Sequence, residues 1–506
     1  MPETSALQKL KSRFANIPEG SGVLFFIQVF ATLGFAVLYS TLVLYATQHL
    51  HFPAKKATAI MGVFGAFNYG LHLFGGYLGG RFLSNRNLFV GGMALQVVGC
   101  GCIAGGTEAL LYIGLALFLT GSGLNVTCIN MMLTQRFQPD DVRREGAFLW
   151  NYAGMNVGFF VGFTAAGHYQ LTEDYTSLFL FATLGNLVSI VLAAIFWKTL
   201  ADRNTPLVEL KDPGRFRLRF AGGLAILFGV VPVVWVLLQH EETEVLVKVI
   251  CAIVGVALVT LTVRHKDARE RSNMWAYLIL ALGSLVFWAL YQMAPSGLQL
   301  FAVNNVDRNV WGVEVAPQWI QNMNTVVIVV GGPLMSALFV RLRGLGWNID
   351  IPKQFAAALL LMGVGFVILP AGIALADPRG MVAFSWLFAS YLLQSIGELL
   401  ISPIGYAMIG KLAPHRYQGI MMGSWMLVTG LASLFAGDFS GMIPEPSEGT
   451  ALTTNAVYSR LFAELGCGSL VVGVVLVVLV PFLQKLIKDE QASSPPATTT
   501  ESISAA

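Results

Sequence analysis

Long apolar runs separated by short polar connections extend from residue 22 to residue 484 of the chain. Runs of about 18 or more apolar residues are long enough to cross the hydrocarbon core of a bilayer as helices. Fourteen such runs are present, at 22–47, 56–80, 87–106, 109–132, 146–167, 177–198, 218–238, 245–263, 273–293, 318–340, 354–376, 382–411, 418–437 and 464–484. This pattern predicts an all-α membrane protein with 14 transmembrane helices.

The basic residues indicate how the predicted helices are oriented across the membrane. With the N-terminal segment counted as cytoplasmic, 25 of the 31 Lys and Arg fall on that side. The other six are Lys55, Lys56, Lys248, Arg308, Arg379 and Arg460. Because Lys and Arg concentrate in the cytoplasmic connections of membrane proteins, we expect a multi-pass protein with both termini in the cytoplasm.

Composition narrows the class of protein and its partners. The 506 residues are 55% hydrophobic and 12% charged, whereas about a quarter of the residues in soluble domains are charged. The mean hydropathy is +0.67. The formal net charge of +3 reflects the orientation of the helices, so it does not indicate a nucleic-acid partner. The expected surroundings are a lipid bilayer, and the protein is expected to be monomeric.

The chain divides at its longest basic connection, Lys198 to Arg219, which separates six predicted helices from eight. We expect the helices at 218–238 and 245–263 to contain almost no polar residues apart from Gln239 and His240 at their shared turn, which is typical of lipid-facing spacers. The predicted divisions are a cytoplasmic tail at 1–21, a six-helix bundle at 22–198, a linker with two extra helices at 199–272, a second six-helix bundle at 273–488 and a disordered cytoplasmic tail at 489–506.

Glu398 is the one carboxylate that the sequence places in the middle of a membrane span. It lies between Ser395 and Pro403, well inside the apolar run at 382–411. A lone ionisable group in hydrocarbon costs several kcal/mol unless it faces a polar cavity or a partner. Glu398 is therefore the leading candidate for a functional residue.

Polar and aromatic residues in other predicted helices extend this candidate site across both halves. The expected substrate-binding residues are Glu398, Asn324, Asn156, Tyr69, Trp288, Gln292 and Trp425. Proton coupling needs a side chain that gains or loses charge inside the cavity, and Glu398 and His72 are the two candidates, one in each half. Amides inside membrane helices also join helices to one another, and a hydrogen-bonded packing role stays open for His72.

Several segments resemble the proton-dependent oligopeptide transporter (POT/PTR) family of the major facilitator superfamily. They are Tyr152-Ala-Gly-Met-Asn156-Val-Gly158, Phe287-Trp288-Ala-Leu-Tyr291-Gln292 and Gly397-Glu398-Leu-Leu-Ile-Ser402-Pro403-Ile-Gly405. The resemblance covers most of the chain. It implies a major facilitator fold, with two six-helix bundles and two extra helices between them, in the cell inner membrane. The bundles of that fold rock around a central binding site.

The departures from the family pattern concern its charged positions. The helix-one motif E-x-x-E-R falls at Gln28, Ala31 and Thr32, and the lysine expected in helix four is Val126. Losing the partner of a buried charge typically costs about 2–5 kcal/mol. These departures suggest a ligand other than an ordinary free di- or tripeptide, such as a carboxylate-blocked, cyclic or amine-bearing compound.

The expected function is secondary active, proton-coupled transport of small peptides or peptide-like compounds by alternating access. One alternative is a transporter of a non-peptide or modified-peptide solute with altered or absent proton coupling, and another is a non-transporting sensor on the same fold. The candidate site contains no nucleophile–base pair and no metal cluster, so we expect no enzyme activity, no catalytic residue, no metal and no cofactor. No P-loop is present to support ATP-driven transport.

Overall fold

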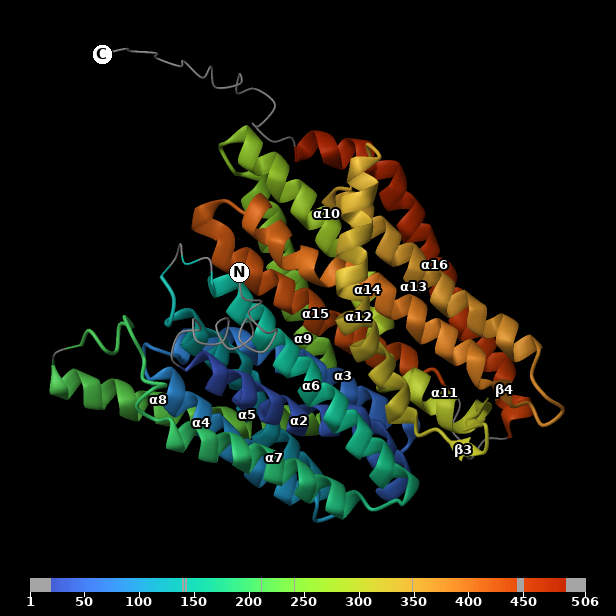
Figure 1. The fold of residues 1–506 in the computed structure, drawn as a ribbon, viewed down its shortest axis with the longest axis horizontal. Coiled ribbons are helices and arrows are strands. Elements are labelled where there is room, and N and C mark those ends of the chain that lie inside the picture. The colour runs from blue at the N-terminus through green and yellow to red at the C-terminus, as the bar shows by residue number, and fades with distance from the viewer. Residues whose placement is uncertain are drawn as a thin grey trace, which may run out of the picture.

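The structure is a computed structural model of the chain. It describes residues 20–138, 141, 143–210, 212–240, 242–347, 349–443 and 450–487. The predicted tail at 489–506, and all but the last two residues of the predicted tail at 1–21, lie outside the described residues. Figure 1 shows an almost entirely helical molecule.

The first half of the chain forms one helical bundle. Its helices are α2 (Ser21–Leu44, continued by a π-helical turn at Tyr45–His49), α3 (Ala54–Leu78), α4 (Asn85–Ile103), α5 (Glu108–Thr134), α6 (Arg143–Leu171) and α7 (Tyr175–Ile195). We call this the N-bundle. Figure 1 shows it in blue and teal.

The second half forms a matching bundle after two linker helices. The linker helices are α8 (Pro213–Gln239) and α9 (Glu242–Val263). The second bundle, here the C-bundle, contains α10 (Ala268–Tyr291), α11 (Gly297–Asn305), α12 (Pro317–Gly344), α13 (Ile351–Ala374), α14 (Phe384–Leu412), α15 (Gln418–Ser440) and α16 (Ala451–Leu486). A 3-10 turn at His415–Tyr417 precedes α15. Four two-residue strands, β1 (Val306–Asp307), β2 (Asn309–Val310), β3 (Val313–Glu314) and β4 (Val382–Ala383), form two small pairings, β1 with β4 and β2 with β3.

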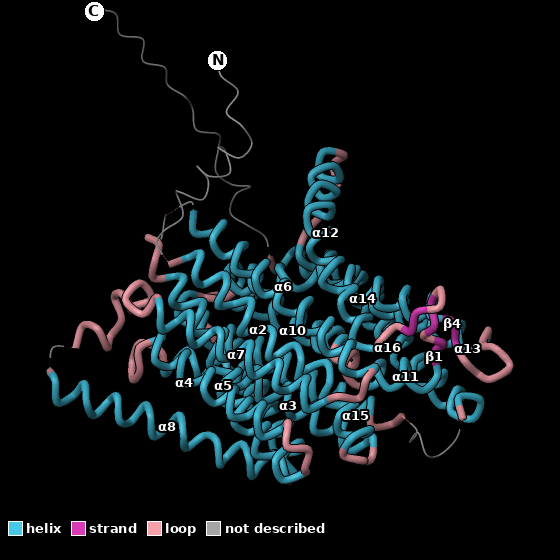
Figure 2. Tube along the Cα trace, turned by 60° about the horizontal axis from the view of Figure 1, so that its bottom comes forward, coloured by secondary structure: helices cyan, strands magenta, loops and turns pink. Residues whose placement is uncertain are grey.

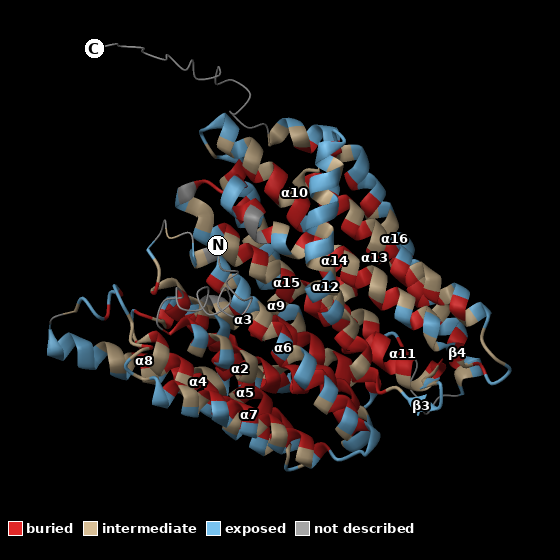
Figure 3. Cartoon of the chain, viewed as in Figure 1, coloured by how far each residue is buried: buried red, intermediate tan, exposed pale blue. Residues whose placement is uncertain are grey.

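Thirteen of the described helices are long and apolar enough to cross a membrane. The remaining predicted span, 146–167, is formed by α6, which has 29 residues but is not among the thirteen. It is less apolar because Asn151, Tyr152 and Asn156 interrupt its hydrophobic sequence. Large apolar side chains such as Leu218 of α8 and Val256 of α9 are exposed, as expected for surfaces that contact lipid. Figure 3 colours the whole chain by burial and shows exposed residues along the outer helices.

Short polar residues fix where several helices begin. The side chains of Ser84 and Thr107 accept hydrogen bonds from the first-turn backbone N–H groups of α4 and α5. Asp212, Asp267 and Asp350 do the same at the starts of α8, α10 and α13. Such caps satisfy N–H groups that have no partner within the helix. They therefore help to fix the residue at which each of these helices begins.

Paired glycines join two of the closest helix pairs. A Cβ on Gly121 of α5 would clash with the carbonyl oxygen of Gly92 of α4. In the C-bundle, a Cβ on Gly363 of α13 would lie 2.9 Å from the carbonyl oxygen of Gly466 of α16. Small residues at membrane helix interfaces allow this approach of one backbone to another. Each bundle is thus tightly packed away from the gap between the two bundles.

The linker helices bridge the two bundles. In the tube view, α8 runs along the outer edge of the N-bundle (Figure 2), where it packs on α5, whereas α9 packs on α15 and α10 of the C-bundle. The expectation that this pair contains almost no polar residues is wrong at one position. Lys248 of α9 donates to both oxygens of Asp438 on α15, at 3.0 and 2.7 Å, and lies 3.5 Å from Glu244. The linker helices therefore make a polar contact with the C-bundle through Lys248.

We predict that Lys248→Met destabilises the protein and that the double variant Lys248→Met/Asp438→Asn recovers much of the loss. The single change leaves two carboxylates without their cation. Because both side chains of the pair are about 30% exposed, the expected cost is below the 3–5 kcal/mol of a fully buried pair, at roughly 1–3 kcal/mol. Thermal unfolding of the detergent-solubilised protein measures it. Equal destabilisation of the single and double variants would contradict the interaction.

Asp202 anchors the connection between α7 and α8 to the start of α4. Its carboxylate accepts the backbone N–H of Asn85 at 2.9 Å and the Asn85 side-chain amide at 3.0 Å. Burial raises the pKa of the Asp202 carboxyl, and the hydrogen bonds from Asn85 only partly oppose this. A raised folded-state pKa means that stability from this group is lost as pH rises through that value.

Two substitutions at Asp202 separate its hydrogen bonds from its charge. Asp202→Ala removes both acceptors and should lower the free energy of unfolding by about 1.5–3 kcal/mol. Asp202→Asn keeps an acceptor oxygen and removes the buried charge, so we expect equal or higher stability than the unmodified protein at pH 7. That advantage should shrink as the pH is lowered, in thermal unfolding at pH 7 and pH 5. An Asn variant as unstable as the Ala variant would rule out this interpretation.

Candidate functional site

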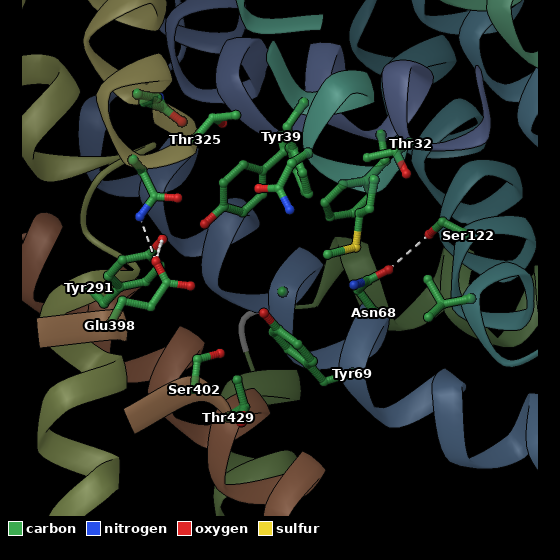
Figure 4. Close-up of a pocket in the computed structure, with 18 of the residues that line it drawn as sticks. Thr32, Tyr39, Asn68, Tyr69, Ser122, Tyr291, Thr325, Glu398, Ser402 and Thr429 are labelled. Atoms are coloured by element: carbon green, nitrogen blue, oxygen red, sulfur yellow. Dashed lines mark hydrogen bonds between the residues drawn. The ribbon is translucent and has the colours of Figure 1, made fainter. Parts of the chain in front are cut away.

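A cavity of about 360 Å³ lies between the N-bundle and the C-bundle. This volume is in the range of small-molecule sites. Figure 4 shows the side chains of both bundles that face one another across it. The N-bundle wall comprises Gln28, Ala31, Thr32, Phe35, Tyr39, Phe64, Gly65, Asn68, Tyr69, His72, Gln96, Ser122, Asn125, Val126, Ile129, Tyr152, Met155, Asn156, Phe159 and Phe163. The C-bundle wall comprises Trp288, Tyr291, Ala294, Gln321, Asn324, Thr325, Ile328, Tyr391, Gln394, Ser395, Glu398, Ser402, Trp425, Met426 and Thr429.

Glu398 lies on the C-bundle wall and is 8% exposed. Its Oε2 accepts a hydrogen bond from the Tyr291 hydroxyl at 2.7 Å and another from the Asn324 side-chain amide. Both donors therefore contact the same oxygen, as the dashed lines in Figure 4 show. Among the described residues, none donates to Oε1. The carboxylate is held in place through one oxygen while the other remains for a ligand or a proton.

The helical repeat of α14 aligns the residues around Glu398. Tyr391 lies seven residues before Glu398, Ser395 lies three residues before it, and Ser402 lies four residues after it. The three residues therefore share one helix face with Glu398. That face lines the cavity. The Tyr391 hydroxyl donates to the carbonyl of Ala294 at 3.1 Å, which ties the face to the end of α10. The sequence around Glu398 thus builds one continuous polar strip in an otherwise apolar helix.

The opposite wall is polar but carries no fixed charge. The Ser122 hydroxyl donates to Oδ1 of Asn68 at 3.0 Å, and this pair faces Glu398 across the cavity in Figure 4. Gln28 donates to the Thr32 hydroxyl at 2.8 Å and accepts from Asn151 at 3.3 Å. These amides and hydroxyls are largely satisfied by one another. The wall offers dipoles, and His72 is its one imidazole among the described residues.

The structure places seven of the eight sequence-predicted site residues on the cavity walls. These are Glu398, Asn324, Asn156, Tyr69, Trp288, Trp425 and His72. Gln292, which was expected on the cavity wall, is the exception, because it is not among the lining residues. Its side-chain amide donates to the backbone carbonyl of Thr429 at 2.9 Å and is 5% exposed. It joins α10 to α15.

Other lining residues were not singled out from the sequence. Tyr39 and Tyr391 line the cavity from α2 and α14, and neither was among the expected site residues. A signal for Tyr39 exists, because Gln28, Thr32 and Tyr39 are four and seven residues apart and so lie on one face of α2. Because that face carries no charge, Tyr39 does not stand out within its long apolar run.

The cavity is closed at one end by contacts between the bundles. We call the side where α2 begins and α16 ends the terminal side, and the opposite side the far side. On the far side, Gln318 donates to Gln170 at 3.1 Å and Trp319 to the Thr164 carbonyl at 2.9 Å. Gln299 donates to the Ser40 carbonyl at 2.6 Å. These bonds join α12 to α6 and α11 to α2.

Glycines complete this far-side seal. A Cβ on Gly437 of α15 would lie 2.9 Å from the carbonyl oxygen of Thr58, and one on Gly62 of α3 would lie 3.1 Å from that of Ser433. Figure 1 shows the bundles lying closest near α11 and spreading apart toward the opposite end. On the terminal half of the cavity, Tyr152 and Val126 are 42% and 36% exposed. The cavity therefore opens toward the terminal side.

Comparison with known proteins identifies the family of this chain. The model of the POT family matches residues 83–456. Dipeptide and tripeptide permease A of Chromobacterium violaceum is 29% identical over 501 residues, which are 97% of this chain and 98% of that permease. The permease of the same name from Escherichia coli is 29% identical over 482 residues, 94% of each chain.

Solved structures agree with the sequence relatives. A crystal structure of peptide transporter POT in complex with sulfate matches with a TM-score of 0.82 at 25% identity, covering 97% of this chain and 98% of that one. A POT family transporter in complex with 5-aminolevulinic acid shares the fold, with a TM-score of 0.79 at 21% identity over 96% of this chain and 99% of that one. The predicted fold class and family are confirmed. With a family model covering most of its length, this multi-pass membrane protein belongs to the POT family.

Proposed function

We propose that the protein is a secondary active transporter that moves small peptides or peptide-like compounds by alternating access, coupled to protons. The observation that carries the proposal is the position of Glu398. An ionisable carboxylate lies in a cavity between two bundles that hydrogen bonds join to each other on the far side. The permeases among the relatives support peptides as the substrate class, in preference to a sensor that does not transport.

Glu398 would receive the ammonium group of the substrate. A carboxylate held through Oε2 by Tyr291 and Asn324 can accept a cation at Oε1 without moving. The charge-assisted hydrogen bond so formed is stronger than one between neutral groups. Trp288 and Tyr69, which lie on opposite walls, offer aromatic faces for the body of the substrate. Asn156 adds hydrogen-bonding capacity on the N-bundle wall.

Proton coupling follows from competition at this carboxylate. A proton on Glu398 removes the negative charge that holds the ammonium group, so proton binding favours substrate release. A substrate ammonium on Glu398 in turn excludes the proton. His72, on the opposite wall, is the second side chain through which a proton can travel with the substrate. The proposal assigns these two residues to coupling and assigns no role to metal or cofactor.

The sealed and open ends define one state of the transport cycle. The positive-inside pattern of Lys and Arg supports a cytoplasmic terminal side, so this state faces the cytoplasm of the cell inner membrane, with both termini cytoplasmic. The far-side seal must then break for the substrate to enter from outside, as the N-bundle and C-bundle rock about the cavity. All of the walls come from one chain, so a monomer is sufficient.

Transport in proteoliposomes tests the proposal. Purified protein should exchange radiolabelled dialanine or dialaninamide against an internal pool of the same unlabelled compound, and an inward proton gradient should drive its accumulation. Protein-free liposomes are the control. The two compounds share a free amino end and a peptide bond, so exchange of either supports the proposed function. Exchange of neither compound, with correctly folded protein, would count against it.

A further inference from the structure

The charges on the cavity wall are unevenly matched to a free peptide. Among the described residues that line the cavity, Glu398 is the only acid, His72 is the only imidazole, and there is no Lys or Arg. A free peptide carries a positive amino end and a negative carboxylate. The cavity thus holds a partner of fixed charge for the first group and none for the second.

The wall that faces Glu398 is built from neutral groups. Val126 is 36% exposed on this wall. The same wall carries two hydrogen-bonded pairs, Asn68 with Ser122 and Gln28 with Thr32. In Asn125 and Gln96 the amide nitrogens contact the Met93 sulfur, and the buried oxygens Oδ1 and Oε1 have no partner among the described residues. Among the described residues, this wall therefore offers a carboxylate hydrogen-bonding dipoles but no cation.

We propose that the cavity selects peptide-like compounds whose amino end is free and whose other end is uncharged, such as peptide amides, peptide esters or lactams. This inference rests on the proposed function and names the substrate class of that same site. A carboxylate taken from water into this cavity loses its hydration and meets no cation, whereas a carboxamide brings its own N–H donors and carbonyl acceptor. The bound monocation and the Glu398 carboxylate together leave the loaded cavity neutral.

Dialanine and dialaninamide form a matched pair for the test, because they differ only in the terminal carboxylate or carboxamide. Affinity is measured by calorimetry on the purified protein, and counterflow in proteoliposomes is measured with each compound. From the usual cost of leaving a buried charge without its partner, we expect dialaninamide to bind roughly 30-fold more tightly than dialanine. Counterflow should show the same preference.

A gain-of-charge variant tests the cause. Val126→Lys places a cation on the neutral wall and should shift the preference toward dialanine by about tenfold or more, whereas Val126→Gln, which adds length without charge, should leave the ratio between the two ligands near that of the unmodified protein. Equal or tighter binding of dialanine by the unmodified protein would overturn this inference and leave the proposed function standing. Failure of both compounds to bind and exchange would overturn the two together. The measurement on the unmodified protein decides the matter even if Val126→Lys does not fold.

Discussion

Glu398→Gln should abolish accumulation of substrate driven by a proton gradient. Glutamine keeps the size of the side chain and can still accept from Tyr291 or Asn324, but it neither carries a charge nor exchanges a proton at neutral pH. Binding of the substrate's ammonium group should also weaken, by about 2–5 kcal/mol if the pair is as desolvated as the 8% exposure of Glu398 indicates. Uptake into proteoliposomes with an inward proton gradient measures the first effect and calorimetry the second.

The control for this substitution is Glu464→Gln. Glu464 lies on α16 at 60% exposure and pairs with Arg460 at 2.7 Å, outside the central cavity. The chemical change is the same, and we expect normal accumulation and normal affinity. If Glu398→Gln accumulated substrate against its gradient in response to pH, Glu398 would not be the coupling group. Calorimetry alone would then decide whether Glu398 binds the substrate.

Gly437→Val should reduce transport by about fivefold or more. The Cβ of any larger residue at position 437 would lie 2.9 Å from the Thr58 carbonyl oxygen and 3.2 Å from the Cα of Gly62, and backbone atoms cannot move aside as a flexible side chain can. The variant must push α15 away from α3, which destabilises the sealed far side by an overpacking cost of about 1–3 kcal/mol. The protein would then spend less time in the state that opens toward the terminal side. Counterflow rate measures the effect.

Gly468→Val provides the matched control. Gly468 belongs to α16 of the same bundle, and a Cβ there would meet nothing within 4 Å. The same substitution therefore meets no steric obstacle at this position, and Val forms a helix no less readily than Gly. Counterflow near that of the unmodified protein is expected for Gly468→Val. A Gly437→Val variant with equally normal counterflow would mean that the contact between α3 and α15 does not limit the cycle.

The features of this fold that could be predicted are those that depend on runs of consecutive residues. Membrane helices need uninterrupted apolar sequence, so the hydrophobic pattern alone locates most of them. The predicted boundaries were wrong where polar residues lie inside a helix. The last span was expected at 464–484, yet α16 begins at Ala451, because Thr454 and Asn455 face Asn305 of α11 and are satisfied there. Polar residues that bond across helices resemble a loop when only their own segment is considered.

Contacts between distant segments account for what the sequence did not reveal about the site. Glu398 was conspicuous because one charge in an apolar run has no other explanation, whereas its partner Tyr291 resembles any interfacial aromatic residue unless α10 and α14 are known to lie side by side. Gln292, one residue further on, was expected in the cavity but bonds to Thr429. Adjacent positions of a helix point about 100° apart, and only packing decides which of the two faces the cavity.

The measurement that tests the central claim most directly compares the affinity of dialaninamide with that of its N-acetyl derivative for the unmodified protein. Acetylation removes the positive charge and leaves the rest of the compound unchanged, so it isolates the interaction assigned to the Glu398 carboxylate. The account predicts that acetylation weakens binding by about 30-fold or more. An N-acetyl compound that binds as tightly as the free amine would contradict it.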